Sequence, residues 1–448
     1  MRSLVFVLTA WLLAGLASAE EQLVVDMAQA PEFRSPIAVA LFQDLSSVKG
    51  AISPASIEEI LVKDLQLSGF FEVLDRKAFL VDLEKEGFTP DQIKFPPWQA
   101  LGALYLCKGW FKLEGDTVTV GAYLYDVIGR KTLDRKQYQG KPKQLRQIVH
   151  RLADRIIELI TGQKGICETR IALTVKRPGK NKGIYIMDYD GAGLEPVAQD
   201  RSIHLSPDWS DDGKRLAYVK LAGLRWELWI AELGGGKPQF RKLPNLPSTI
   251  SSPAFSPNGT DLALSMATRD DMEIFLVDLT GTALPRRLTS AWNIDVSPCY
   301  SPDGRQIVYT SSVTGQRHLY IMNADGTFPR RLTFNGRNNE TPAWSPRGDL
   351  IVFAGMDDDG KFDLFTVKLD GSELKRLTWD TENNESPTWS PDGRYLMFAS
   401  NRKIELEGTT VAGRYHLFMM KANGTNQTLI TKESAGDYTE PAWGPLPR

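Results

Sequence analysis

Cysteine and histidine are both scarce in this chain of 448 residues. The three cysteines, Cys107, Cys167 and Cys299, have a spacing that matches no metal-binding motif, and an odd number leaves at least one thiol unpaired even in an oxidising compartment. We expect them to be buried free thiols. Each of the four histidines falls in a different predicted element, so no histidine-rich metal site is expected. The sequence predicts no metal and no cofactor.

Excess charge of one sign is also absent. The chain has 53 basic and 55 acidic residues, a formal net charge of −2. A protein that neutralises nucleic-acid phosphates usually carries a basic surface, so no nucleic-acid partner is expected. Beyond the first twenty residues, no apolar run is long enough to cross a bilayer, so the mature chain is not expected to span the membrane. We expect a monomer.

The first nineteen residues have a composition of their own. Arg2 precedes the apolar run "LVFVLTAWLLAGLA", which ends in the small residues Ala17, Ser18 and Ala19. This order is typical of a secretory signal peptide, with cleavage between Ala19 and Glu20. An N-terminal membrane anchor is the alternative, but the apolar run is short for one. We expect an exported, soluble mature protein.

Residues 36–165 predict a small α/β domain. An apolar helical stripe runs from Leu145 to Ile160 and ends at Thr161-Gly162, and a helix of this kind buries its stripe on a sheet. An earlier helix is expected to begin at Ser53-Pro54 or at Ser56, where Glu59 would complete a capping box. Strands are expected at 37–42 and 70–74, and a hairpin around Glu114-Gly115-Asp116.

From about residue 169 the helical periodicity disappears and a repeat takes its place. Stretches such as "YSPDGRQIVYTS" and "WSPDGRYLMFAS" recur, with aromatic residues 46, 45, 44, 45 and 54 residues apart at Trp209, Phe255, Tyr300, Trp344, Trp389 and Trp443. A period in the mid-forties is the signature of four-stranded propeller blades. Six Gly-containing turns between third and fourth strands, such as Asp325-Gly326, indicate six blades.

The ends of the repeat predict how the ring closes. The first blade, 170–199, lacks an aromatic-Ser-Pro first strand, and "YTEPAW" at 438–443 is a first strand with no blade after it. We expect this C-terminal strand to complete the first blade, which leaves no unpaired edge in the ring. The 54-residue spacing is ascribed to a long loop at 401–414. The expected fold is therefore an N-terminal α/β domain followed by a six-bladed β-propeller over 166–448.

Two segments of the α/β part carry a family resemblance beyond the repeat. "SIEEILVKDLQLSGFFEVLDR" at 56–76 and "RQIVHRLADRIIELITGQKGICETRIALT" at 146–174 are similar to segments of the TolB family, and so is the propeller repeat. Cys167 departs from the phenylalanine frequent in that family. The resemblance implies a periplasmic, non-enzymatic component of the Tol–Pal system, which binds the lipoprotein Pal and the protein TolA, supports outer-membrane integrity and envelope constriction at cell division, and is exploited in some hosts by colicins or phage.

The polar connections from each fourth strand to the next first strand are the expected recognition surface, because loops on a rigid scaffold usually carry recognition. The family resemblance implies that this face receives Pal. Matching to the family implies Thr249, Ser252 and Val296. Five more contact residues are expected only from their positions in these connections: His204, Asn293, Asn338, Glu340 and Glu385. For Glu340, Glu385 and Glu440 a structural role is the alternative, in which they tie neighbouring first strands together near the axis.

The mature N-terminus at 20–35 alternates polar and apolar residues before Pro31 and Pro36. An unpaired strand of this kind can add to the edge of a partner's sheet. The resemblance implies an arm that binds TolA, with contacts expected at Glu21, Gln22, Leu23, Val24, Val25 and Phe33. The alternative is a fixed edge strand of the protein's own domain, and the two can be alternative states.

Two other classes of function stay open. A propeller-type hydrolase would need a nucleophile motif such as G-x-S-x-G, which is absent, or several axial histidines, of which only His204 is expected in a channel-mouth loop. A periplasmic sensor would use the channel to bind a glycan or a peptide. The stretch "MDDDGK" at 356–361 resembles part of a calcium loop, but consecutive aspartates cannot converge on one ion, so an acidic hairpin loop is predicted.

Overall fold

The computed structural model describes residues 34–82, 86–234, 236–244, 246, 249–269, 271–280, 282–290, 293–356, 358–379, 382–406 and 408–447. Residues from 34 onward form one compact unit. The predicted signal peptide, its cleavage position and the arm contacts from Glu21 to Phe33 lie outside the described residues.

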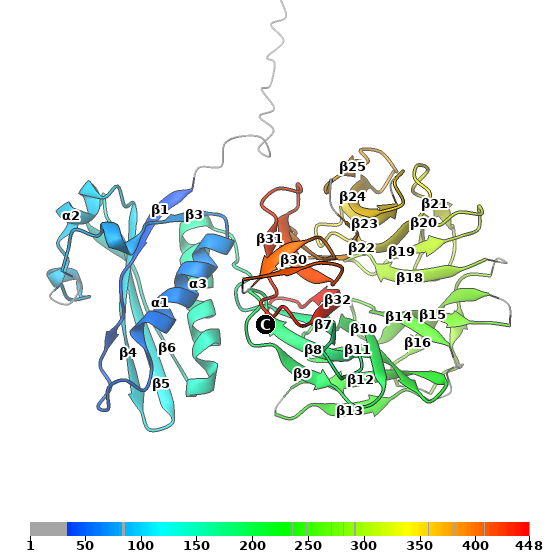
Figure 1. Ribbon diagram of the computed structural model, residues 1–448, viewed down its shortest axis with the longest axis horizontal. Coiled ribbons are helices and arrows are strands. Elements are labelled where there is room, and N and C mark those ends of the chain that lie inside the picture. The colour runs from blue at the N-terminus through cyan, green and yellow to red at the C-terminus, as the bar shows by residue number, and fades with distance from the viewer. Residues whose placement is uncertain are drawn as a thin grey trace, which may run out of the picture. The chain divides into compact units, whose positions relative to one another are not determined.

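The N-terminal part of this unit is a mixed sheet with two long helices on one face (Figure 1). The strand order is β3-β1-β4-β5-β6, with β2 beside β4. Its strands are β1 (Ser35–Val39), β2 (Gln43–Asp44), β3 (Phe71–Val73), β4 (Tyr105–Glu114), β5 (Thr117–Asp126) and β6 (Lys131–Gly140). Its helices are α1 (Pro54–Leu67), α2 (Phe95–Ala100) and α3 (Leu145–Thr161), with short 3-10 turns η1 (Arg76–Ala78), η2 (Pro90–Gln92) and η3 (Pro142–Gln144).

Helix α1 begins at the first of the two predicted positions. Ser53 has extended backbone angles and Pro54 occupies the first helical turn, where its missing N–H costs no hydrogen bond. The predicted capping box at Ser56 is wrong. Ser56 already lies inside the helix, and its hydroxyl donates to the carbonyl of Ser53 at 2.7 Å.

Helix α3 confirms the predicted apolar stripe. Ile148, Val149, Leu152 and Ile156 are buried against the sheet and α1. The helix ends where expected, because Gly162 adopts the left-handed conformation (φ 72°) that glycine tolerates without steric cost. Strand β6, which the sequence did not predict, completes the sheet at its edge.

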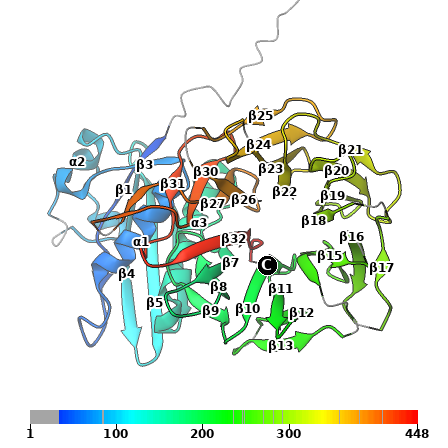
Figure 2. The ribbon, with the colours of Figure 1, turned by 45° about the vertical axis from the view of Figure 1, so that its right-hand side comes forward.

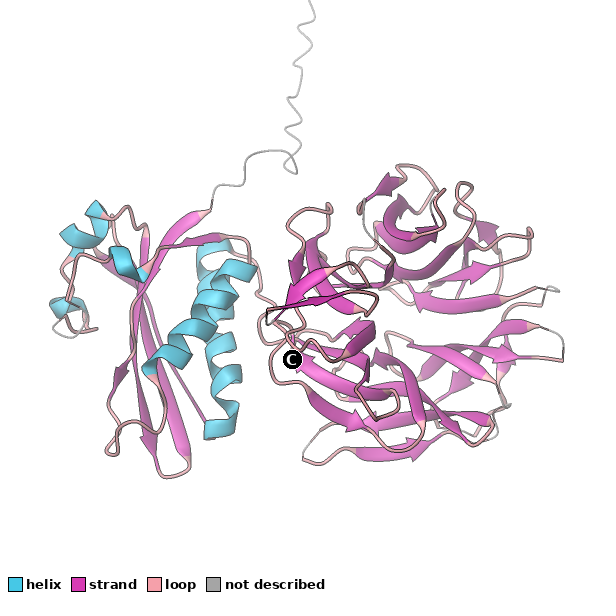
Figure 3. Cartoon of the chain, in the orientation of Figure 1, coloured by secondary structure: helices cyan, strands magenta, loops and turns pink. Residues whose placement is uncertain are grey.

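The rest of the unit contains six four-stranded blades among the described residues (Figures 2 and 3). Blade one is β32 (Asp437–Trp443), β7 (Arg170–Lys176), β8 (Gly183–Asp188) and β9 (Glu195–Ala198). Blade two is β10 (Ile203–Trp209), β11 (Arg215–Ala222), β12 (Arg225–Glu232) and β13 (Gln239–Lys242). Blade three is β14 (Ile250–Phe255), β15 (Asp261–Ala267), β16 (Met272–Asp278) and β17 (Arg286–Arg287).

Blades four to six repeat this pattern. Blade four is β18 (Asp295–Tyr300), β19 (Gln306–Ser311), β20 (His318–Asn323) and β21 (Arg330–Arg331). Blade five is β22 (Asn339–Trp344), β23 (Leu350–Met356), β24 (Phe362–Lys368) and β25 (Lys375–Arg376). Blade six is β26 (Asn384–Trp389), β27 (Tyr395–Ser400), β30 (His416–Lys421) and β31 (Thr428–Leu429).

The predicted closure of the ring is confirmed. The C-terminal strand β32 pairs antiparallel with β7, from Asp437 opposite Lys176 to Trp443 opposite Ile171. Blade one is thus built from both ends of the propeller sequence. The long loop in blade six also lies where expected, and it forms a hairpin of its own, β28 (Ile404–Leu406) and β29 (Thr409–Val411).

A bulge interrupts the first strand of every blade at the same place. The residue before the recurring proline has φ between 48° and 54°, a left-handed conformation that costs a non-glycine residue about 1–3 kcal/mol. The pairing with the second strand shifts register at this point, and the bulge turns these residues toward the axis. The six residues are Ser206, Ser252, Ser297, Thr341, Ser386 and Glu440.

Candidate partner-binding face

The connections between blades meet at one face of the propeller. In blade four, Asp295, Ser311 and His318 lie side by side on three neighbouring strands, so the start of β18 and the loop between β19 and β20 share one end of the blade. The connection from β21 to the next blade arrives at the same end, where Asn338 pairs with Arg317. We call this end the loop face. The Asp-Gly turns lie at the opposite end, the turn face.

A repeated hydrogen-bond cluster holds the loop face in place beneath its surface. In blades three to six, a threonine after the fourth strand accepts a backbone N–H from the third strand, at 2.9–3.3 Å. The same threonines bond the side chain at the start of the third strand, which is Glu273, His318, Asp363 or His416. The threonines are Thr289, Thr333, Thr378 and Thr431. Sequence reasoning missed this role, although the recurring "RLT" was the visible signal.

The polar side chains in this cluster are buried, and burial shifts the pKa values of three of them. Burial lowers the pKa of His318 and of His416, so both rings are neutral at pH 7. Burial raises the pKa of Glu273, whose carboxylate bonds Thr289 and Arg287. The loop ends are therefore anchored by groups that hydrogen-bond to one another, which makes the loop face a rigid platform.

Three of the predicted contact residues lie at the start of first strands. Thr249 is exposed just before β14, Ser252 occupies the bulge of that strand, and Val296 is half-buried in β18. Asn338 is half-buried, and its carbonyl accepts the N–H of Met356 at 2.8 Å. These four residues have side-chain surface that a partner could reach on or near the loop face.

His204 and Asn293 are placed differently. His204 was expected in a channel-mouth loop, and this position is wrong: it lies in β10, is 2% exposed, and has its Nε2 2.9 Å from Asp200 Oδ1. The strand begins earlier than its polar sequence suggested, because Ile203 already pairs with Leu221. Asn293 is also buried, and its Nδ2 donates to Asp295 and to Ser311.

The three glutamates do not form one set. Glu440 occupies the bulge position, and its Oε2 accepts from the backbone N–H of Ser206 at 2.8 Å and from Thr174 Oγ1 at 2.7 Å. It therefore ties the first strands of blades one and two, as the structural alternative proposed. Glu340 and Glu385 stand one position earlier in their strands. They bond Arg317 Nη1 at 2.7 Å and Tyr415 Oη at 2.8 Å instead.

A channel of about 580 Å³ runs along the inner strands. It is lined by the bulge residues, the prolines after them and the start of the turn face, and Ser252 is the one predicted contact among its lining residues. Its described charged residues, Asp208, Asp211 and Glu440, are all acidic. Burial raises the pKa of Asp208 to about 7, although its carboxylate accepts the N–H of Phe255 at 2.7 Å.

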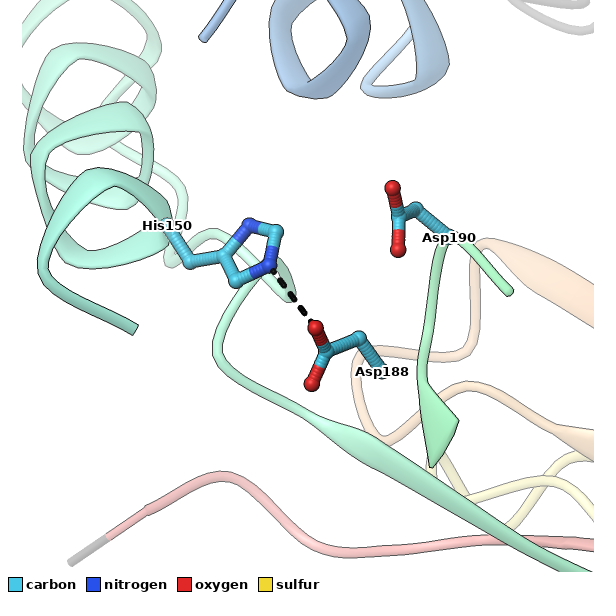
Figure 4. Close-up of side chains that lie close together, drawn as sticks. All are labelled: His150, Asp188 and Asp190. Carbon is cyan, nitrogen blue, oxygen red and sulfur yellow. Dashed lines mark ion pairs between the residues drawn. The ribbon is translucent and has the colours of Figure 1, made fainter. Parts of the chain in front are cut away.

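One group of described side chains comes close enough together to hold a metal ion. His150, Asp188 and Asp190 have ligand atoms within 4.8 Å of one another (Figure 4). However, Arg146 donates to both aspartates at 2.7 and 2.9 Å, and Lys63 Nζ lies 3.2 Å from Asp190. These cations already occupy the place that a metal would take, so the geometry fits an ion-pair network better than a metal centre.

The predicted acidic hairpin loop is confirmed. Asp358 and Asp359 are exposed in the turn between β23 and β24. Their side chains extend from consecutive residues into solvent. None of the helices in the described ranges is long and apolar enough to cross a lipid bilayer.

Family models match both parts of the chain. The model described as the TolB beta propeller domain matches residues 157–447, and the TolB amino-terminal domain matches residues 23–133. The chain belongs to the TolB family. The first of these matches alone spans more than half of the sequence, and it includes the closing strand β32.

Proteins similar in sequence to this TolB-family member are named as TolB proteins or TolB homologs. The Tol-Pal system protein TolB of Desulfosudis oleivorans is 33% identical over 258 residues, 57% of this chain and 58% of the relative. That of Syntrophotalea carbinolica is 38% identical over 192 residues, 41% and 44% of the two chains. The TolB homolog of Chlorobium chlorochromatii is 34% identical over 277 residues, 61% of each. The matches thus span about half the length of these relatives.

A solved structure extends the likeness to nearly the whole chain. The crystal structure of TolB from Acinetobacter baumannii superposes with a TM-score of 0.76 at 25% sequence identity. It covers 93% of this chain and 98% of the other. The two-part architecture is therefore the architecture of a known TolB.

Proposed function

We propose that this TolB-family protein is a periplasmic scaffold of the Tol–Pal system that binds Pal through the loop face and TolA through the N-terminal arm. On this proposal the protein is exported with a cleaved signal peptide, is not an enzyme, and supports outer-membrane integrity and envelope constriction. Membership of the TolB family carries the proposal. The anchored loop ends add physical support, since a rigid platform loses little conformational entropy on binding.

The test of Pal binding separates loop-face residues from fold residues. We expect Thr249→Arg to weaken the affinity for the periplasmic domain of Pal about tenfold or more, because a bulky cation in a packed interface removes contacts and leaves a charge to be desolvated. Thr249 is exposed and its side chain supports no described contact, so the fold should be retained.

The matched control is Leu284→Arg, which changes a residue that is 84% exposed in the turn between β16 and β17, at the turn face. Titration calorimetry measures both variants against Pal. Equal affinities for the two variants and the unsubstituted protein would rule out the loop face near Thr249. A chain that binds cell-wall fragments and shows no affinity for Pal would instead favour a channel sensor.

The arm proposal is tested by deletion. Removing residues 20–33 from the mature protein should reduce capture of TolA's periplasmic domain to background, because the arm would supply the backbone hydrogen bonds of an added strand. The sheet begins at Ser35, so the described fold should be unaffected. A variant with the same residues in scrambled order keeps the length and charge as a control. Capture equal to that of the full arm would contradict the proposal.

A further inference from the structure

The two domains are joined by a buried network of charges. Helix α3 contributes Arg146 and His150, and helix α1 contributes Asp64. Strand β8 ends at Asp188, and Asp190 stands in the turn that follows. His150, Asp64 and Asp190 are each no more than 2% exposed, so the charges face one another and not water.

Both ring nitrogens of His150 face a carboxylate of a different element. Nδ1 lies 2.7 Å from Asp64 Oδ2. On the other side of the ring, Nε2 lies 3.5 Å from Asp188 Oδ2, the ion pair drawn as a dashed line in Figure 4. A neutral imidazole has one N–H and one lone pair, so it could donate to only one of them. Arg146 Nη2 carries two N–H groups, and it donates to Asp190 at 2.9 Å and lies 3.3 Å from Nε2. A neutral ring would accept from Arg146 at Nε2 and leave Asp188 without a bond from the ring, whereas an imidazolium donates to both carboxylates.

The other titratable groups around the ring balance the remaining charge. Helix α1 places Lys63 beside Asp190, with Nζ 3.2 Å from the carboxylate, and the segment after β31 brings Lys432 near Lys63. Tyr189 donates its hydroxyl to Asp64 Oδ1 at 3.0 Å and also contacts Cys167. Burial raises the pKa of both the Tyr189 hydroxyl and the Cys167 thiol, so neither is charged near neutral pH.

We propose that His150 is held as an imidazolium between Asp64 of the N-terminal domain and Asp188 of blade one, and that this proton locks the two domains together. The ring would bond acidic side chains of both domains at once. Loss of its proton leaves two buried carboxylates facing a neutral ring. The junction would then loosen, and the apolar cluster that the two domains share would be left as its main contact.

The direction of the pH dependence follows from the contacts. Burial by itself would lower the pKa of His150, but its bonds to Asp188 and Asp64 outweigh burial and raise the pKa from 6.5 to about 9. The folded junction therefore holds this proton on the order of a hundredfold more tightly than an unfolded chain does. The stabilisation is complete below about pH 6.5 and is lost as the pH rises through about 9.

The first experiment follows the ring itself. In the full mature chain with carbon-labelled histidine, we expect the His150 resonance to titrate with a midpoint well above 7, and the His318 and His416 resonances to stay in their neutral positions. Assignment comes from the spectrum of the His150→Gln variant or, if that variant does not fold, from His204→Gln, His318→Gln and His416→Gln by elimination. A His150 midpoint at or below the ordinary histidine value would overturn the proposal.

The second experiment measures, by calorimetry of the same protein, whether the two domains unfold together. We expect one unfolding transition at pH 7 that separates into two at pH 10, and two transitions at both pH values for His150→Gln. His318→Gln is the control, since that buried ring bonds Thr333 and Asn339 and faces no carboxylate at this distance. If His150→Gln changes with pH as much as the unsubstituted protein does, Lys63 or Lys432 is the titrating group and the proposal fails.

Discussion

Ending the chain after Gly436 should abolish the cooperative unfolding transition of the propeller. This truncation removes strand β32, including Tyr438 and Trp443, which are 1% and 8% exposed. Loss of one large buried aromatic side chain usually costs about 3–5 kcal/mol, and a domain has only about 5–15 kcal/mol of stability. The truncation also leaves β7 as an unpaired edge and removes Glu440, which bonds blade two.

The matched control ends the chain after Gly444. It keeps β32 and its pairing with β7, and removes the partly buried Leu446 together with its neighbours. We expect its thermal midpoint to fall by a few degrees only, as for a loss of about 1 kcal/mol. Circular dichroism during heating measures both proteins. Similar midpoints for the two truncations would contradict a closing role for β32.

Replacing Lys108 by Met should destabilise the N-terminal domain by about 3–5 kcal/mol, because removal of one partner of a buried ion pair leaves the other charge buried and uncompensated. Lys108 and Glu86 have side chains that are 2% and 3% exposed, and Nζ lies 2.8 Å from Oε2. Glu86 also accepts from Lys94 N at 2.9 Å and from Trp98 Nε1 at 3.2 Å. Burial lowers the pKa of Lys108, which the contacts with Glu86 partly offset.

A second substitution distinguishes lost charge from lost packing. In the double variant Lys108→Met, Glu86→Gln, the uncompensated charge is gone while an oxygen acceptor remains for Lys94 and Trp98. We expect it to recover at least half of the stability that the single variant loses, as measured by urea unfolding. A double variant no more stable than Lys108→Met alone would show that the pair acts through packing and not through charge.

The period of the repeat made the propeller predictable, because each blade is a local unit whose strands and turns are close in sequence. The missing first strand at residue 170 and the surplus one at 438 made the closure predictable in the same way. The helical stripe from Leu145 predicted α3 with its end at Gly162. Strand β6 gave no such signal, since an edge strand with mostly exposed side chains has little hydrophobic alternation.

The positions of the candidate site residues could be predicted less well from the sequence. His204 and Asn293 lie in connections that are polar overall, yet both are buried: pairing of β10 with β11 buries His204, and Asn293 bonds Asp295 and Ser311. Glu440 was grouped with Glu340 and Glu385, but it directly precedes the recurring proline and so occupies the bulge position, whereas the other two stand one residue earlier. A one-residue shift turns a strand side chain to the opposite face, so pattern matching alone cannot assign its contacts.

By itself, the sequence determined the number of blades, the order of the domains, the closing strand and the family, because all of these follow from periodicity and local motifs. Only the tertiary structure decided which polar side chains are exposed on the loop face and which face one another. Lys108 with Glu86, and His150 with Asp64 and Asp188, are far apart in the chain and carry no local signature. Their pairing depends on which surfaces the fold removes from water, since burial is what makes an uncompensated charge costly.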